Sequence, residues 1–248
     1  MRNQAAWQPT KFERHRGGWR GSRDAAELGV GSRLMGDLVA ARYAAHLPAH
    51  ARGRLLDLGC GKAPLYGAYA ALVTEVTCVD WAPGDYIDQH CDLSEPLPFP
   101  DGRFDTIVLS DVLEHIAEPA QLWREMTRVL APGGQVIMNV PFYYAVHAHP
   151  HDYYRYTNFA LERFVQMNGL ELRVLVALGG INEILADLLA KALSKLPVLG
   201  PPLAMAVQAV IGAFGRTRFG ARIAAVSSRH FPFGYFMIAQ RPPAPPLP

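Results

Sequence analysis

Two glycines and an aspartate mark the ends of two apolar runs in the first third of the chain. Residues 55–61 read Leu-Leu-Asp-Leu-Gly-Cys-Gly, and a second apolar run ends in Asp80. Gly59 and Gly61 allow positive φ and carry no Cβ, so a ligand can approach the backbone closely. Pro64 suits the first turn of a helix, whose N–H groups can hold a carboxylate or phosphate. Asp80 can accept hydrogen bonds from ribose hydroxyls, so the pattern predicts a site for a nucleoside-containing ligand.

A dinucleotide such as NAD fits this pattern less well than a cationic ligand does. The dinucleotide fingerprint needs a third small residue at the position that Pro64 occupies. Asp57 lies directly before the glycines, where it would repel a pyrophosphate and attract a cation. S-adenosylmethionine has an ammonium, a sulfonium, a carboxylate and a ribose, and it satisfies each of these features.

A second group of chemically capable side chains follows an apolar run that ends near residue 140. Residues 141–157 hold three histidines, an aspartate, an arginine and five tyrosines. Ligands of α/β sheets bind beyond the carboxyl ends of the strands, so this loop should face substrate. A hydroxyl nucleophile needs a base, and histidine suits that role, so we expect His149 or His151 to act as base or substrate clamp. Asp152 and Arg155 would orient that histidine, or would pair with each other to hold the loop.

The same loop leaves a metal site open as an alternative. In an extended segment, His147, His149 and His151 would point to one side. Imidazole rings with Asp152 could then bind zinc or iron, which would indicate a metal-dependent hydrolase or oxygenase. No pair of cysteines has metal-site spacing, and the three cysteines are expected to be small buried residues. We therefore prefer a site without a resident metal, and a metal that helps a methyltransferase orient its acceptor is a milder alternative.

Strands are expected near residues 54–58, 75–79, 87–91, 104–110 and 134–140, with helices near 64–71 and 119–130. A helix at 159–168, a strand at 170–178 and a last strand at 234–240 follow. Strands that alternate with helices predict an α/β fold whose parallel strands are joined by right-handed crossovers.

Four blocks in this order resemble the class I S-adenosylmethionine-dependent methyltransferases, and in particular the branch called methyltransferase type 11. The blocks are residues 55–61, 79–80, 104–116 and 128–141. Ala63 departs from the third glycine that many members have. The resemblance implies a Rossmann-like, seven-stranded, mostly parallel sheet with helices on both faces. The last strand would be antiparallel and lie between the fifth and sixth strands.

The resemblance also implies S-adenosylmethionine as cofactor and assigns residues to it. Asp57 and the glycine backbone would hold the methionine end, and Asp80 the ribose. Asp92 would lie near the adenine, or would cap a turn. The implied cofactor-binding residues are Asp57, Gly59, Cys60, Gly61, Asp80, Trp81, Asp92, Leu93, Ser110 and Asp111. His115 could approach the reactive methyl group or could orient the loop.

Residues 149–157 are similar to a His-x-x-Asp-Tyr-x-Arg-Tyr-Thr stretch of methyltransferases from bacterial glycan and natural-product clusters. We therefore expect methyl transfer to a small-molecule or glycan-type acceptor, at oxygen, rather than a regulator without catalysis. A net charge of +2 argues against a nucleic-acid partner. The first residues lack an apolar signal core, so a cytoplasmic location is expected. The acceptor and the oligomeric state stay open.

The expected organisation is one methyltransferase domain over residues 1–248. It comprises an N-terminal arm and cap helix (1–47), a cofactor-binding core (48–180), a helical insertion (181–230), the last strand (231–241) and a disordered tail (242–248). Within the arm, a helix is expected at 24–47, residues 1–9 should be poorly ordered, and Trp19 could belong to a lid. The insertion carries an apolar helical stripe and a run without charges at 196–214. It could be a substrate cap, an interfacial helix pair that touches membrane near a lipid-linked acceptor, or a transmembrane span.

Overall fold

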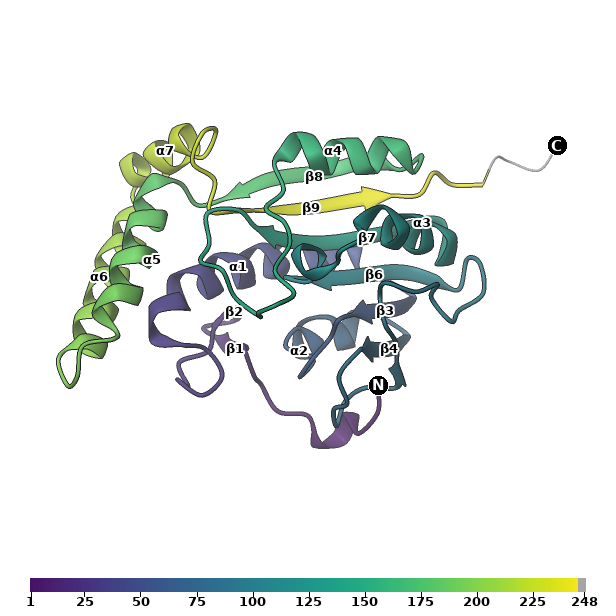
Figure 1. Ribbon diagram of the computed structural model, residues 1–248, viewed down its shortest axis with the longest axis horizontal. Coiled ribbons are helices and arrows are strands. Elements are labelled where there is room, and N and C mark those ends of the chain that lie inside the picture. Colours follow the sequence, from purple (N-terminus) through teal and green to yellow (C-terminus); the bar gives the residue numbers. More distant parts are fainter. Residues whose placement is uncertain (245–248) are drawn as a thin grey trace. The chain divides into compact units, whose positions relative to one another are not determined.

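In the computed structural model, the described residues are 1–244, and they form two compact units (Figure 1). The first unit comprises residues 1–8, 46–176 and the chain from Tyr235 onward. The second comprises residues 9–45 and 177–234. The expected disordered tail at 242–248 falls mostly outside the described residues.

The first unit is built on a seven-stranded sheet with the order β5-β4-β3-β6-β7-β9-β8. Its strands are β3 (Arg54–Leu58), β4 (Glu75–Asp80), β5 (Gln89–His90), β6 (Phe104–Ser110), β7 (Leu130–Pro141), β8 (Glu171–Leu178) and β9 (Gly234–Gln240). From β5 to β7, each strand pairs parallel with its neighbours in this order. In Figure 1 the arrow of β9 points opposite to those of its neighbours β7 and β8. The predicted Rossmann-like sheet, with its antiparallel last strand between the fifth and sixth, is therefore confirmed.

Helices α2 (Tyr66–Tyr69), α3 (Pro119–Val129) and α4 (Asn158–Met167) belong to the same unit. Helix α3 buries residues at helical spacing, namely Leu122, Trp123, Met126 and Val129. Strand β3 is buried from Leu55 to Leu58, as a central parallel strand covered on both faces requires. The third strand is shorter than expected and the fifth is longer, whereas β3 and β6 have the expected bounds.

The first residues of the chain contact the first unit instead of lying loose. A short 3-10 helix, η1, covers Gln4–Ala6. The Trp7 indole nitrogen donates to the Ala63 carbonyl at 3.1 Å, and its ring packs against Tyr66. The Asn3 side chain donates to the Asp85 carbonyl at 2.9 Å. The expectation of poor order is wrong here, because an aromatic anchor and several hydrogen bonds fix the segment.

The second unit contains a hairpin and a group of helices. Strands β1 (Phe12–His15) and β2 (Gly18–Gly21) pair antiparallel, and a short 3-10 helix, η2 (Val30–Ser32), precedes α1 (Arg33–His50), most of which lies in this unit. Helix α1 begins nine residues later than expected. Asp24 instead accepts a hydrogen bond from the Ala26 amide, forming a turn, and glycines follow at 29 and 31.

The insertion is helical, as expected, and it forms three helices, α5 (Ile181–Leu193), α6 (Gly200–Gly215) and α7 (Arg218–Ser227). The uncharged run at 196–214 is interrupted by a turn before α6 begins at Gly200. Across residues 1–244, no helix has both the length and the apolar character needed to cross a bilayer. The transmembrane alternative is therefore set aside.

Candidate functional site

The loop after β3 has the conformation that its glycines predict. Gly59 and Gly61 have φ of +66° and +52°. A Cβ added at Gly59 would lie 2.7 Å from the Val112 side chain, so packing requires glycine there. A Cβ at Gly61 would meet nothing within 4 Å, so this part of the loop borders open space. Ala63 also has positive φ, at +50°, which is the backbone geometry that a third glycine would adopt more easily.

Asp57 lies beneath this loop, where its carboxylate is buried. The Tyr69 hydroxyl donates to its Oδ2 at 2.7 Å. The pKa of Asp57 is raised to about 7. Burial is the main cause, the nearby Asp80 acts in the same direction, and the hydrogen bond from Tyr69 opposes both. Cys60, next to the glycines, is a buried free thiol whose pKa is raised by its hydrogen bond to Cys78 and by burial. A buried carboxyl with a pKa near neutrality can lose its proton when a positively charged group of a ligand binds beside it.

Asp80 ties the ends of β3 and β4 together. Its Oδ2 accepts from the Gly61 amide at 2.8 Å, and its Oδ1 accepts from the Ala82 amide at 3.0 Å. An ionised carboxylate has about four acceptor positions, so ribose hydroxyls could still bind beside these amides. Trp81, the next residue, is 62% exposed. Asp80 therefore has a structural role that the sequence did not suggest, and its role toward a ribose stays a prediction.

Asp92 accepts a hydrogen bond from the Ser94 amide at 2.8 Å and is exposed. This is the turn-capping geometry that was the alternative to adenine binding. The adjacent Leu93 is buried.

Ser110 and Asp111, at the end of β6, are linked through a residue that the sequence did not single out. The Ser110 hydroxyl donates to Asn139 Oδ1 at 2.8 Å, and Asn139 Nδ2 donates to Asp111 Oδ1 at 2.6 Å. Asn139 is buried near the end of β7. An amide side chain between the apolar residues Met138 and Val140 was the signal that could have revealed it.

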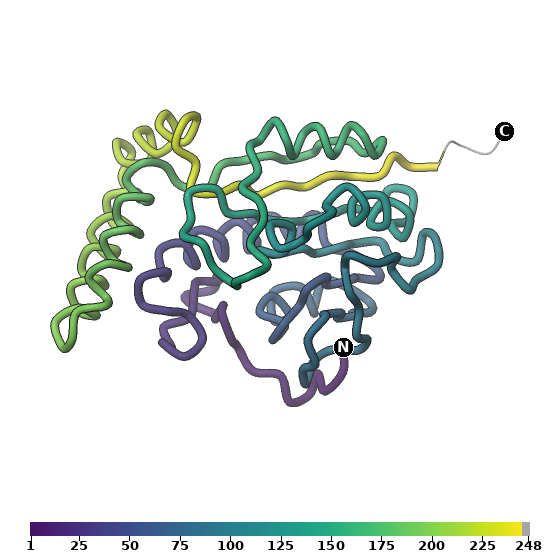
Figure 2. Tube along the Cα trace, in the orientation of Figure 1, coloured from purple at the N-terminus to yellow at the C-terminus, as the bar shows by residue number. Residues whose placement is uncertain are grey.

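The segment between β7 and α4 is a long loop without helix or strand, as the tube in Figure 2 shows. Arg155 holds it by donating to both oxygens of Asp152, at 2.6 and 2.8 Å. The same guanidinium reaches the Ala145 carbonyl at 3.3 Å. The hydrogen bond from Arg155 keeps the pKa of Asp152 well below its ordinary value. This pair therefore stabilises the loop, which was the second of the two roles expected for it.

The three histidines of the loop do not share one side. Ala148 has a φ of +50°, and the His151 amide donates to its carbonyl, so the chain turns between His147 and His151. The His151 ring contacts Trp81, with 5.4 Å between ring centroids, and its Nδ1 lies 3.0 Å from the Tyr153 hydroxyl. His149 is exposed. The alternative of a metal site made of His147, His149 and His151 is therefore wrong.

His147 instead faces Glu114 and His115, in the 3-10 helix η4 (Leu113–His115) after β6. Glu114 is fully buried, and its Oε1 lies 3.6 Å from His115 Nε2 and 3.8 Å from His147 Nε2. The His115 Nδ1 donates to the His151 carbonyl at 2.7 Å, which is the loop-orienting role expected as its alternative. Burial and the nearby His115 lower the pKa of His147.

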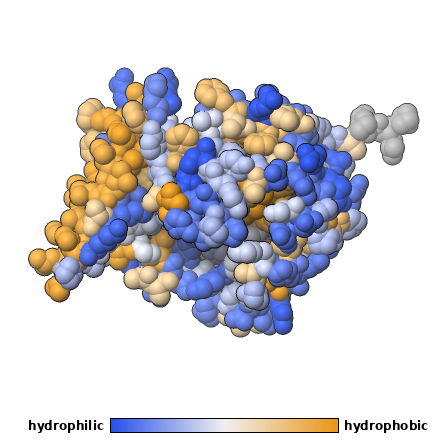
Figure 3. Space-filling model, in the orientation of Figure 1, coloured by the Kyte–Doolittle hydropathy of each residue, from blue (hydrophilic) through white to orange (hydrophobic). Residues whose placement is uncertain are grey.

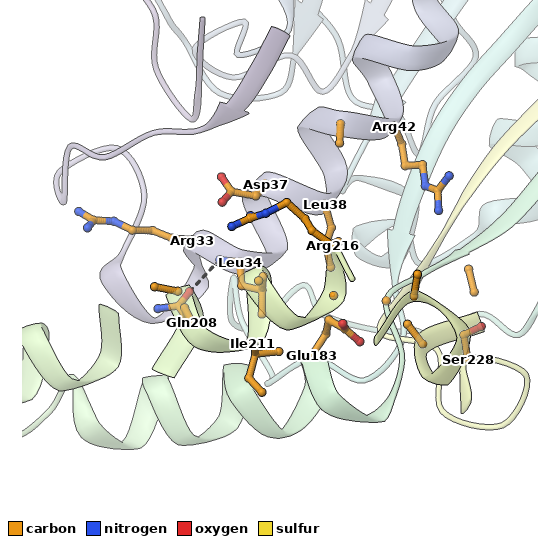
Figure 4. Close-up of a pocket in the computed structure, with 18 of the residues that line it drawn as sticks. Arg33, Leu34, Asp37, Leu38, Arg42, Glu183, Gln208, Ile211, Arg216 and Ser228 are labelled. Carbon is orange, nitrogen blue, oxygen red and sulfur yellow. Dashed lines mark hydrogen bonds between the residues drawn. The ribbon is translucent and has the colours of Figure 1, made fainter. Parts of the chain in front are cut away.

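The second unit holds a cavity of about 940 Å³ among α1, α5, α6 and α7 (Figure 4). The Gln208 side chain crosses part of it and accepts a hydrogen bond from the Leu34 amide at 2.7 Å. Arg23 forms a bidentate pair with Asp37 at its rim. Arg33, Arg42 and Arg216 also line it, among largely apolar neighbours. Sequence reasoning missed this cavity, because its wall combines the N-terminal segment with the distant insertion.

Comparisons with known proteins bear on the first unit. Residues 56–138 match a family model described as "Methyltransferase domain", of type 11. A ubiquinone biosynthesis O-methyltransferase of Xanthomonas campestris is 34% identical over 120 residues, which are 42% of this chain and 47% of the relative. A second, from Xanthomonas euvesicatoria, is 31% identical over 36% of this chain and 43% of its own length. The chain thus spans less than half the length of these curated relatives.

Solved structures share the fold. An S-adenosylmethionine-dependent methyltransferase from Mesorhizobium loti superposes with a TM-score of 0.54 at 17% identity, covering 84% of this chain and all of the other. That fold is the one that the four sequence blocks predicted, and the family model spans two of them fully and most of the other two. S-adenosylmethionine as methyl donor is what this family implies. The chain therefore contains a class I S-adenosylmethionine-dependent methyltransferase domain of type 11.

Proposed function

We propose that this chain transfers the methyl group of S-adenosylmethionine to an oxygen atom of a small-molecule acceptor. The observation that carries the proposal is the contact between His151 and Trp81. Trp81 directly follows Asp80, which binds the Gly61 amide of the cofactor loop. This contact supports a position for His151 beside the proposed cofactor site. The curated relatives are named for O-methyl transfer in ubiquinone biosynthesis, which favours oxygen as the methylated atom.

In this proposal the glycine loop holds the methionine end of the cofactor and Asp80 its ribose. Asp80 lies close enough to Asp57 to raise the pKa of Asp57, and the ionised form of Asp57 would favour the cationic end of the ligand. Ser110 and Asp111, fixed by Asn139, line the same carboxyl edge of the sheet. Bound S-adenosylmethionine supplies an activated methyl group, so the protein has to align two reactants and exclude water.

His151 acts as the base in this proposal. When its Nδ1 donates to the Tyr153 hydroxyl oxygen, its Nε2 carries a lone pair that can take the acceptor proton. The acceptor oxygen then bonds to the methyl carbon while the carbon–sulfur bond breaks, and S-adenosylhomocysteine leaves. His115 positions the loop through the His151 carbonyl, and Asp152 with Arg155 closes it. His149, exposed two residues away, would clamp the acceptor.

The first experiment is calorimetric titration with S-adenosylhomocysteine, followed by turnover on a panel of phenolic and catecholic acceptors. Asp80→Asn should weaken binding about 10- to 100-fold, because it removes charge-assisted hydrogen bonds. His151→Gln should lower kcat by about 100-fold or more with little change in affinity for S-adenosylhomocysteine. Unchanged binding by Asp80→Asn would overturn the cofactor site. Full turnover by both His149→Gln and His151→Gln would overturn the roles given to these histidines.

A lipid-linked or membrane-bound acceptor is a second candidate, supported by the surface of the second unit. Figure 3 shows apolar residues gathered over the region of α5 and α6. Exposed members include Leu185, Leu188, Leu189, Val198, Leu199 and Val210. An exposed apolar surface of this kind is typical of an interaction site, and arginines at 218 and 222 on α7 would favour anionic lipid.

A further inference from the structure

Three electron-pair donors converge beside the proposed acceptor loop. They belong to Glu114, His115 and His147, each of which offers one ligand atom, and these atoms lie within 4.8 Å of one another. Glu114 and His115 come from η4 after β6, and His147 comes from the loop after β7. Both segments follow strands that are neighbours in the sheet, so the group belongs to the carboxyl edge where class members bind ligands.

The tautomers of both histidines follow from their other ring nitrogens. His115 Nδ1 faces the His151 carbonyl at 2.7 Å, and His147 Nδ1 faces the Ala145 carbonyl at 3.2 Å. A carbonyl can only accept, so each Nδ1 carries the hydrogen and each neutral ring keeps its Nε2 lone pair. The two Nε2 atoms lie 3.6 and 3.8 Å from the same carboxylate oxygen of Glu114. A cation bound by these three side chains would bring the two lone pairs and the carboxylate together as ligands.

The geometry points to a divalent transition-metal site, such as one for Zn²⁺, formed by Glu114, His115 and His147. Two imidazoles and one carboxylate are a common donor set for such ions, and they leave a coordination position for substrate. Ligand atoms around a tetrahedral zinc are about 3.4 Å apart, close to the two distances seen here. Histidines that bind metal usually donate their second nitrogen to a carbonyl or carboxylate, and both rings do so.

The shell around these ligands is held in place. The backbone carbonyl of Glu114 accepts from the amides of Tyr153 and Tyr154, at 2.9 and 3.2 Å. Asp152 accepts from the His147 amide at 2.9 Å and lies 3.4 Å from the His147 Nδ1. The Arg155 pair with Asp152 therefore also fixes one ligand of the metal. The half-buried histidines leave one side of the group open to a small acceptor.

The role that this metal would have in the reaction rests on the proposed function. A metal here would bind the acceptor oxygen and make its hydroxyl more acidic, so that His151 removes the proton more readily. The oxygen then forms its bond to the methyl carbon as the carbon–sulfur bond breaks. A chelating acceptor, such as one with two adjacent oxygens, would gain most from this arrangement.

The test is a titration of chelator-treated protein with Co²⁺, which reports coordination through its visible absorption, and with Zn²⁺ by calorimetry. Neither measurement needs cofactor or acceptor. We expect one equivalent to bind, with an absorption that indicates four or five ligands. His147→Ala and Glu114→Gln should each weaken binding at least tenfold. His230→Ala, which changes an exposed histidine in the second unit, should leave binding unchanged.

Binding of S-adenosylhomocysteine serves as the control for folding, since it does not use the three ligands. If Glu114→Gln does not fold, the half-exposed His147→Ala decides the question. The metal site is overturned if the chelator-treated wild type binds no stoichiometric Co²⁺, or if His147→Ala binds it as tightly as the wild type does. Either result would leave cofactor binding and methyl transfer intact, so it is distinct from a failure of the proposed function.

Discussion

At the carboxyl edge of the sheet, buried polar residues are hydrogen-bonded within the protein and can also interact with a bound ligand. Asp80 accepts from the cofactor loop and can accept more, and Asp57 accepts from Tyr69 while its pKa lies near 7. A buried carboxyl at that pKa changes charge in response to small changes in its surroundings. Cofactor binding at this edge should therefore be coupled to proton release.

The affinity for S-adenosylhomocysteine should depend on pH through Asp57. Burial raises its pKa to about 7, so the free protein holds a neutral carboxyl below that pH. The ligand's ammonium favours the ionised form, so affinity should fall by up to about tenfold for each pH unit below 7. Calorimetry between pH 5.5 and 8.5 would measure this slope. Asp57→Asn should bind more weakly and without the slope, and a flat wild-type profile would show that Asp57 does not face the ligand's charge.

The stability of the free protein should change in the opposite sense. A carboxyl whose folded pKa is raised from 3.8 to about 7 contributes stability that is fully present below pH 3.8 and is lost as pH rises through 7. Tyr69→Phe removes a hydrogen bond that favours the ionised carboxylate. It should therefore increase this loss near neutral pH, which urea unfolding at pH 5 and pH 8 would measure.

Residues whose roles depend on local spacing could be predicted from the sequence. Gly59, Gly61 and Asp80 follow short apolar runs, and each lies where that pattern places it. Asn139 and the pairing of Glu114 with His147 could not be predicted in this way. Their partners come from strands far apart in the sequence, and only the register of the sheet brings them together.

At the level of elements, the loop between β7 and α4 organises the proposed acceptor site. Two of its backbone amides donate hydrogen bonds to the Glu114 carbonyl in η4. The ion pair between Arg155 and Asp152 holds the loop together. The sequence predicted its position after the fifth strand and its chemical density. It could not predict which histidine faces which partner, because the turn at Ala148 breaks the alternation of an extended segment.

Arg155→Ala should loosen this loop without affecting the cofactor pocket. It removes two short charge-assisted hydrogen bonds to Asp152 and the contact with the Ala145 carbonyl. We expect kcat/KM for the acceptor to fall about tenfold or more, with the affinity for S-adenosylhomocysteine unchanged within about twofold. The matched control is Arg163→Ala, an exposed arginine on α4. Equal effects of the two variants would mean that the loop is not held by Arg155.

At the scale of the whole molecule, the chain adds a second compact unit to a methyltransferase core. That unit joins residues 9–45 with 177–234, so segments from the two ends of the core sequence fold together. An apolar helical stripe predicted a helical insertion but not its division into three helices, and the cavity among α1, α5, α6 and α7 follows from their packing and has no local signal. The family model does not reach this unit, so its role has to be argued from its own surface.

The apolar surface of α5 and α6 should bind a lipid bilayer. Val198 and Leu199 are 87% and 67% exposed in the turn before α6, and burying two such side chains is worth about 3 to 6 kcal/mol. The intact chain should float with vesicles of phosphatidylcholine and phosphatidylglycerol, and less at high salt because α7 carries Arg218 and Arg222, which would attract anionic lipid. The double variant Val198→Asp, Leu199→Asp should lose at least tenfold in binding. Leu172→Asp, an exposed position on β8 in the first unit, is the matched control. Wild-type protein that stays with the unbound fraction would rule out the membrane surface and leave a freely diffusing acceptor as the substrate class.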